Sequence, residues 1–214
     1  REYVENSLKA AEVCKLSLQE YLPPRNKAKE AGAPNLVPEL YRKAYEQFIK
    51  ATASVESGDV KNGLKEAEKA VPLYDIAEME AIRIEILGSA DRLIEKALVD
   101  EAGKYALSTL DKAQTAREKA NAILSNDRYN RTEAVQEAKR AEYEAQHASS
   151  IATSVRSLNK NDQAWEKLML VYEIQMNRVG KELGLDYLPF HNGPLEAADT
   201  LIARIITLRT DRDR

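Results

Sequence analysis

The most regular feature of the sequence is a series of alanines between Thr132 and Arg156, spaced alternately by four and three residues. This is the spacing of a heptad, so the methyl groups form one stripe along a single helix, and Val155 continues it. Large side chains hold neighbouring helices about 8–10 Å apart, whereas methyl groups allow an approach at the near end of that range. We therefore predict that this helix is buried against a close neighbour. The alanines of this seam are Ala134, Ala138, Ala141, Ala145, Ala148 and Ala152.

The same three-four periodicity predicts helices along most of the chain, from its start onward. The first helix has Val4 and Leu8 among its apolar positions and should end before Pro23-Pro24. A short basic segment, 25–31, follows it. We expect a loop at Gly32-Ala33-Pro34.

Two further helices are predicted before residue 100. Pro38 suits the first turn of one helix, which should close at Gly58-Asp59. The other starts near Val60 and, if Pro72 and Gly88 merely bend it, extends to Val99 over about 60 Å. A break at Pro72 or Gly88 is the alternative. The apolar stripes are Leu40, Ala44, Phe48, Ala51 and Val55 in one helix, and Ala67, Ala70, Tyr74, Ala77, Ala81 and Ile84 in the other.

The pattern then repeats. A new helix begins at Leu107, a turn is expected at Ser125-Asn126-Asp127, and Thr132 is predicted to cap the alanine-seam helix. The segments 40–70 and 110–141 match at an offset of 70 residues at the start and 71 at the end, which indicates an internal repeat of helical hairpins. The stripe of the new helix is Leu110, Ala113, Ala116, Ala120 and Leu124.

The C-terminal part is predicted to be a pair of helices within 162–209. The first should end at Gly184, with Trp165 either as a core anchor or as a platform for a ligand. The second should cover Leu195–Leu208, followed by a linker-like tail, 210–214. Together these elements predict one all-α domain over 1–214, an elongated antiparallel bundle built from two hairpin repeats, at about 36–85 and 105–155, with added N- and C-terminal helices.

The connection between the last two helices combines aromatic side chains with prolines. Tyr187, Phe190 and His191 lie there beside Pro189 and Pro194. Fixed proline φ angles lower the entropy lost when a loop is ordered on a partner, and flat amphipathic side chains dominate interfaces. We predict a partner contact at the three aromatic residues. The alternative is a connector whose aromatic rings close the end of the bundle.

Composition supports the predicted helices and argues against nucleic acid as a partner. The chain has 30 alanines against 8 glycines and 7 prolines, which favours helix. Its net charge is −3 with both signs interleaved, so no basic surface for nucleic acid is expected. No apolar run has the length of a membrane span. The chain begins at Arg1 without an initiator Met, so we expect a fragment, and its one cysteine, Cys14, is expected to be buried.

Candidate chemistry is sparse. Glu144 and His147 have the Glu-x-x-His spacing of di-iron helical bundles, but such sites need a second copy of the motif, and a solvated helix face is the alternative. The sequence contains no nucleophile elbow and no glycine-rich phosphate loop. We therefore predict no catalytic residues, no cofactor and no metal, and expect the chain not to be an enzyme.

The repeat resembles an uncharacterised family of Ala-rich helical domains in bacterial cell-envelope proteins. The resemblance lies in Pro38-Glu39-Leu40, Gly58-Asp59 and the segment 66–70, and in the second copy at Asp127 and 137–141. The second copy lacks the leading Pro and the turn Gly and has extra residues after Asp127. Such domains often precede an OmpA-like peptidoglycan-binding domain. The resemblance implies a periplasmic or envelope location, and contact with peptidoglycan only through a domain outside these residues.

Two functions follow as hypotheses. The first is a non-catalytic envelope scaffold or spacer, whose partner would be an envelope protein or a second copy of the chain. The second is a tetratricopeptide-like adaptor for another protein, favoured by a concave groove, whereas a straight closed bundle would favour the spacer.

Overall fold

The computed structural model describes residues 11–159 and 163–212, and every regular element in those ranges is a helix. The predicted all-α class is therefore confirmed. By its contacts the chain divides into two compact units, 1–150 and 151–214. The prediction of one domain over 1–214 stays a prediction, because two compact units can belong to one domain. The predicted apolar positions Val4 and Leu8 lie outside the described residues.

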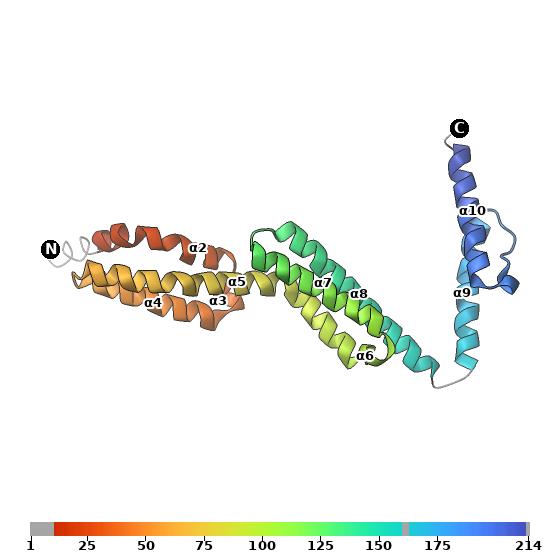
Figure 1. Cartoon of the computed structure of the whole chain (residues 1–214), viewed down its shortest axis with the longest axis horizontal. Helices are drawn as coiled ribbons and strands as arrows, with labels where there is room; N and C mark the ends of the chain where they lie inside the picture. The colour runs from red at the N-terminus through yellow and green to blue at the C-terminus, as the bar shows by residue number, and fades with distance from the viewer. Residues whose placement is uncertain (1–10, 160–162, 213–214) are drawn as a thin grey trace. The chain divides into compact units, whose positions relative to one another are not determined.

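The elements follow one another with short connections (Figure 1). Residues 11–18 are helical. The later elements are η1 (Gln19–Tyr21), α2 (Leu22–Glu30), α3 (Ala33–Leu36), α4 (Pro38–Glu56), α5 (Val60–Val99), α6 (Ala102–Tyr105), α7 (Leu107–Asn126), α8 (Arg131–Leu158), α9 (Gln163–Glu182), η2 (Phe190–Asn192) and α10 (Pro194–Arg212).

Helix α5 is continuous over 40 residues, passing through both Pro72 and Gly88. Pro72 lies on an exposed side of the helix, where a missing backbone hydrogen bond can be replaced by water. The helix begins with the Asp59 side chain accepting a hydrogen bond of 3.0 Å from the backbone N–H of Asn62. The alternative of a broken helix is therefore excluded.

The internal repeat extends further towards the N-terminus than its sequence pattern indicates. Helix α4 is preceded by the short helix α3, and α7 by the short helix α6. Each short helix follows a residue with positive φ, Gly32 at 78° and Glu101 at 66°. These two residues are 69 positions apart, as are Ala33 and Ala102, both fully buried. Two copies of one helix–turn–helix arrangement thus follow each other along the chain.

The two copies share α5. Helices α2 and α4 pack on its first half, and α7 packs on its second half (Figure 1). Helix α8 also lies along the second half, where Arg131 forms an ion pair of 3.1 Å with Glu85 and Lys96 donates to Ser149. One helix is therefore the last member of the first helix group, α2–α4–α5, and the first member of the second group, α5–α7–α8.

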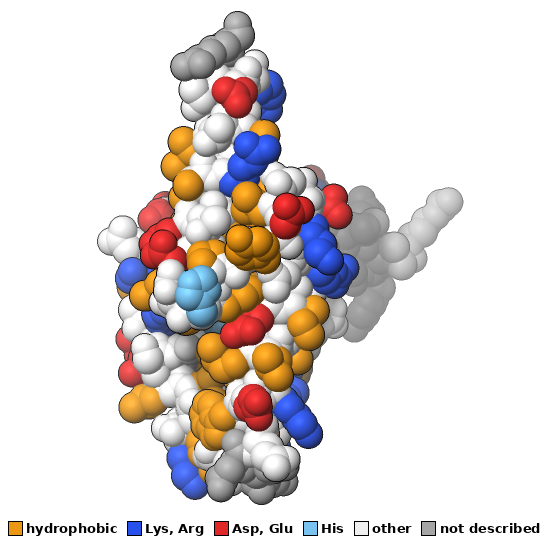
Figure 2. Space-filling model, turned by 90° about the vertical axis from the view of Figure 1, so that its right-hand side faces the viewer, with side chains coloured by type: hydrophobic (Ala, Val, Ile, Leu, Met, Phe, Trp, Pro, Cys, Tyr) orange, Lys and Arg blue, Asp and Glu red, His pale blue; other side chains and the backbone are white. Residues whose placement is uncertain are grey.

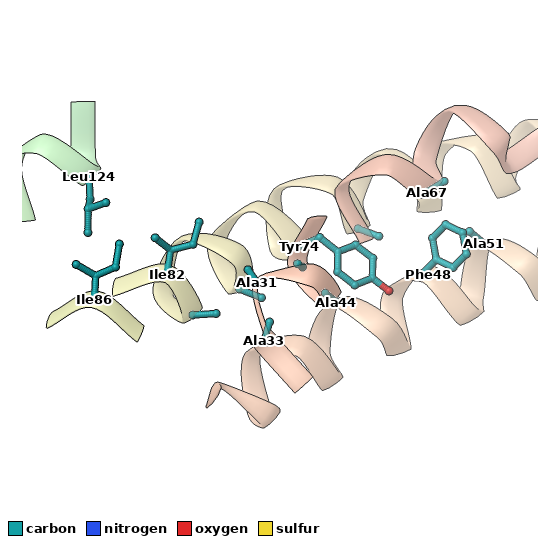
Figure 3. Packing of buried hydrophobic residues seen from close by; sticks show 14 of the residues in the cluster. Ala31, Ala33, Ala44, Phe48, Ala51, Ala67, Tyr74, Ile82, Ile86 and Leu124 are labelled. Carbon is teal, nitrogen blue, oxygen red and sulfur yellow. The ribbon is translucent and has the colours of Figure 1, made fainter. Parts of the chain in front are cut away.

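The buried face of α5 changes between the two groups. Ala67, Ala70, Tyr74, Ala77 and Ala81 are buried as predicted, but Ile84 is 42% exposed. The prediction for Ile84 was wrong because the second half of α5 turns a different face to its neighbours. Beyond residue 81 the helix buries Ile82, Ile86, Leu87, Ala90 and Ala97. Figure 3 shows Ile86 close to Leu124 of α7, while Tyr74, Phe48 and Ala44 lie further along the same buried cluster.

The alanine seam is confirmed. All six of its alanines are at most 3% exposed, and Val155 is half-buried. Ala90, Ala116 and Ala141, from α5, α7 and α8, form one buried cluster of methyl groups. The stripes of α4 and α7 are also buried, except that Leu40 is half-buried.

The first helix ends at Leu18, before Pro23-Pro24 as predicted. The two prolines nevertheless open a new helix, since they lie in the first turn of α2, so the basic segment 25–31 is largely helical. Pro34 lies in the first turn of α3, so the predicted loop shrinks to the residues around Gly32.

The remaining corrections concern α8 and α10. Helix α8 starts at Arg131, so Thr132 is inside it, and the Asn130 side chain donates instead to Glu133. Pro194 is the first residue of α10, which continues to Arg212 rather than ending at Leu208. The predicted tail is thus helical to that point, and Asp213 and Arg214 lie outside the described residues.

Candidate functional site

The connection between α9 and α10 is fixed to α9 by a buried leucine. Leu188 is 5% exposed, and a methyl group placed on Gly180 would lie 3.5 Å from its Cγ, so the leucine packs directly over the glycine. The chain reverses at Gly184, whose φ is 74°. The backbone N–H of Leu185 donates to the Gly180 carbonyl at 2.9 Å, and Arg204 of α10 donates to the Leu183 carbonyl at 2.9 Å. The loop is therefore held from both helices.

The three aromatic residues predicted as a partner contact lie on this loop in different surroundings. Tyr187 is 80% exposed, His191 is exposed and Phe190 is half-buried at the start of η2. The backbone N–H of Gly193 donates to the Phe190 carbonyl at 2.8 Å, which closes the turn. The loop thus presents Tyr187 and His191 to solvent while Leu188 supplies the buried contact. Sequence reasoning missed Leu188, because its burial depends on the position of Gly180 in the folded hairpin.

Helix α9 buries much less of its apolar surface than its pattern predicts. Trp165 is 49% exposed, so its prediction as a core anchor was wrong for the described residues. The one buried residue of α9 is Gly180, because α10 and Leu188 cover only that part of the helix. Figure 2 shows hydrophobic side chains spread over the face of the α9–α10 hairpin.

A polar cluster lies where the two helix groups meet. Glu78 of α5 is 2% exposed and is the only buried charged residue in the described ranges. Its carboxylate accepts from Arg128 Nη1 at 2.9 Å and from the Tyr129 hydroxyl at 2.8 Å, while Arg128 also donates to the Asp75 carbonyl. The Lys27 ammonium of α2 lies 5.4 Å from the Tyr129 ring centre. Glu78 thus bonds to two residues of the α7–α8 turn, and the cluster holds that turn on the middle of α5.

This cluster coincides with a difference between the two copies of the repeat. Arg128 and Tyr129 belong to the residues inserted after Asp127 in the second copy of the repeat, where the first copy has only Gly58-Asp59. The insertion reaches the buried Glu78, so it holds the two helix groups together instead of merely lengthening a turn.

The remaining candidates for chemistry are isolated. His147 Nδ1 lies 3.9 Å from Glu144 Oε2 within one turn of α8. Within 11–159 and 163–212 no group of three or more His, Cys, Asp or Glu residues is placed to hold a metal ion. Cys14 is buried as expected. Burial, and secondly the Glu56 carboxylate, raise the pKa of the Cys14 thiol and so disfavour the nucleophilic thiolate.

No protein-family model, curated protein or solved structure matches this chain. In the part of the chain that the structure describes, no helix combines the length and apolar character that crossing a membrane requires.

Proposed function

We propose that this chain is a non-catalytic helical scaffold or spacer of the bacterial cell envelope. The observation that carries the proposal is the shared helix α5, which connects two repeats without an intervening loop. A straight α-helix of 40 residues is about 60 Å long, and each half of α5 is supported by further helices.

Two features resist bending where the helix groups meet. The buried core is continuous through this region, since residues of the first group and Ala120, Leu124, Ala134 and Ala138 of the second belong to one cluster. The Glu78–Arg128–Tyr129 contacts cross the same region. A hinge at α5 would have to separate packed methyl groups and expose a buried carboxylate, and both changes cost free energy.

The envelope location rests on the resemblance of the repeat to Ala-rich helical domains of bacterial envelope proteins. That resemblance lies in the Pro-x-Leu start, the Gly-Asp turn and the Glu-Ala-rich helix. On this proposal, peptidoglycan is bound by a domain outside these residues, and the present chain sets its distance from an anchor. Fractionation of the source cells, with the intact protein detected by an antibody to this chain, tests the location. Recovery with the cytosolic fraction alone would contradict it.

Spin labels on α5 test the stiffness that a spacer needs. Cysteines replace the exposed Lys61 and Glu95 in a Cys14→Ser background. A rigid helix places the two positions about 50 Å apart, with one narrow distance distribution by double electron–electron resonance. A broad or bimodal distribution would show a hinge at Pro72 or Gly88, and the spacer proposal would fail.

A tetratricopeptide-like adaptor is the second candidate, and it is favoured by the exposure of Tyr187 and His191 on a well-held loop. The length of α5 argues against the adaptor, because this helix alone is longer than the 34 residues of a whole tetratricopeptide repeat. A photoreactive amino acid at Tyr187, introduced in the source cells, distinguishes the two. One dominant cross-linked protein that is lost in the His191→Ala variant would favour the adaptor, and no specific cross-link would favour the spacer.

A further inference from the structure

Helix α9 carries an apolar side chain alternately every four and every three residues along nearly its whole length. This spacing is that of the a and d positions of a heptad, so the side chains fall on one narrow stripe. We call this stripe the α9 seam, and it consists of Trp165, Met169, Tyr172, Met176 and Val179.

The α9 seam is left largely open by the hairpin that contains it. Trp165, Met169, Tyr172 and Val179 are 44–60% exposed, and Met176 is half-buried. Within α9, the loop and α10, the buried residues are Gly180, Leu188 and Ala197. A pair of helices with so small a core buries too little apolar surface to offset its conformational entropy, so further burial is needed.

We propose that the α9 seam is a self-association surface, on which α9 of a second copy packs in parallel to form a dimer. A large side chain at half exposure leaves roughly 100 Å² open, so five seam residues offer roughly 500 Å² per copy. Flanking atoms such as those of Leu168 add to this, so two copies would bury roughly 1,000 Å² in total, which is at the low end of specific interfaces. The area available therefore suits a dimer.

The charges beside the seam favour the parallel arrangement. In a parallel pair, Leu168 of one copy lies beside Glu173 of the other, so no like charges meet there. An antiparallel pair centred on Tyr172 would place Glu173 next to Glu173 of the second copy, which is unfavourable.

The test uses the full chain and its single tryptophan. Light scattering over a hundredfold range of protein concentration should show the mass rising from that of one 24.0 kDa chain to twice that value. Trp165 emission should shift to shorter wavelength over the same range, because the indole leaves water on dimerisation. A mass that stays at one chain, with emission independent of concentration, would overturn the proposal, including the case where the seam is covered within the same chain.

Paired variants locate the surface. Met169→Glu and Tyr172→Glu place a charge in the seam and should raise the dimer dissociation constant by roughly tenfold or more, since tenfold corresponds to only 1.4 kcal/mol. Val171→Glu and Ile174→Glu are matched controls on the other side of α9, at 53% and 56% exposure, and should leave it unchanged within about twofold. Equal effects of both pairs would refute the seam as the interface.

A last variant separates association from folding. Tyr172→Ala truncates a seam side chain. Because alanine has the highest helix propensity of all residues, this variant cannot act by unwinding α9. It should weaken the dimer while leaving the helix content by circular dichroism unchanged. An undiminished dimer in this variant, together with an undiminished dimer for Tyr172→Glu, would contradict the proposal.

Discussion

Two glycines in the same helix are expected to respond in opposite ways to replacement by alanine. In Gly63→Ala, the added Cβ would lie 2.4 Å from Val55 Cγ2 and 3.0 Å from the Ala51 carbonyl oxygen, both in α4. In Gly88→Ala, the nearest atoms, in Arg92 and Ile84, are 3.8 Å and 3.9 Å away, which is ordinary contact. Both substitutions gain the same helix propensity, so the difference between them reports the close packing of α4 on α5.

The magnitude follows from the size of the overlap. Carbon atoms in contact lie about 3.5–4.0 Å apart, so the new methyl group overlaps Val55 by more than about 1 Å. Valine in a helix has one strongly preferred rotamer, and the Ala51 oxygen belongs to the backbone, so α4 and α5 must move apart. Overpacking of this kind costs about 1–3 kcal/mol, against a propensity gain of about 1 kcal/mol. Gly63→Ala should therefore lower the free energy of unfolding by up to about 2 kcal/mol, whereas Gly88→Ala should raise it by about 0.5–1 kcal/mol.

Urea denaturation followed by circular dichroism at 222 nm measures both changes. A third variant, Val55→Ala combined with Gly63→Ala, removes the overlapping methyl group. The cost of Gly63→Ala should shrink in this background, as a coupling of about 0.5–3 kcal/mol in a double-mutant cycle. If Gly63→Ala stabilises the protein as much as Gly88→Ala, the helices separate freely at this point and the close-packing argument is refuted.

The remaining predictions concern the alanine seam, the polar cluster, the first core and the loop. Ala145→Leu or Ala141→Leu should destabilise the protein by about 1–3 kcal/mol in the same denaturation assay. The control Ala122→Leu, at an exposed position of α7, should change stability by less than about 0.5 kcal/mol. If both seam variants are neutral, the seam tolerates large side chains. Glu78→Gln should lower the free energy of unfolding by about 1–3 kcal/mol, because it weakens the ion pair with Arg128. Glu85→Gln, in an exposed pair with Arg131, should lower it by less than about 1 kcal/mol. Similar losses in the two variants would contradict a special role for the buried carboxylate. Burial, with a smaller contribution from Tyr41, raises the pKa of Tyr74 in the folded chain. The unfolded chain therefore loses this proton first, near pH ~10, and the free energy of unfolding should fall as the pH rises further. Tyr74→Phe should reduce that fall, and an unchanged slope of the unfolding midpoint against pH would contradict the prediction. Phe190→Ala should lower stability by less than the roughly 3–5 kcal/mol typical of a buried aromatic because Phe190 is only half-buried, whereas a full loss in thermal unfolding would show that the ring closes the end of the hairpin and is not a partner contact.

The buried helices could be predicted from the sequence because small side chains at heptad spacing leave little ambiguity. Ala134 to Ala152 have a single burial pattern, and the structure confirms each one. The continuity of α5 could not be decided, because whether Pro72 breaks a helix depends on which side of the helix it faces. The exposure of Ile84 could not be predicted either, because a second set of helices packs on another face of α5 and the stripe itself does not reveal that face.

The parts that were missed depend on contacts between distant residues. Nothing in the local sequence at Glu101 indicates a positive φ, and only alignment with Gly32 of the first copy would have suggested it. Glu78 looks like any charged helical residue until the turn residues Arg128 and Tyr129 are placed on it. For the loop, the aromatic residues were recognised by type, but Leu188 as its buried contact required the position of Gly180.

The shared helix also has a consequence for how the chain unfolds. Helix nucleation is unfavourable and propagation is not, so an α5 already formed in one helix group provides a template on which the other group can fold. Conversely, melting of either group leaves half of α5 without its neighbours, and that half is then prone to fray. In the language of linear repeat arrays, the coupling between adjacent repeats here includes a covalent, hydrogen-bonded helix as well as a packed interface. The two groups should therefore melt in one cooperative transition, and a nick at the midpoint of α5 would divide that transition into two.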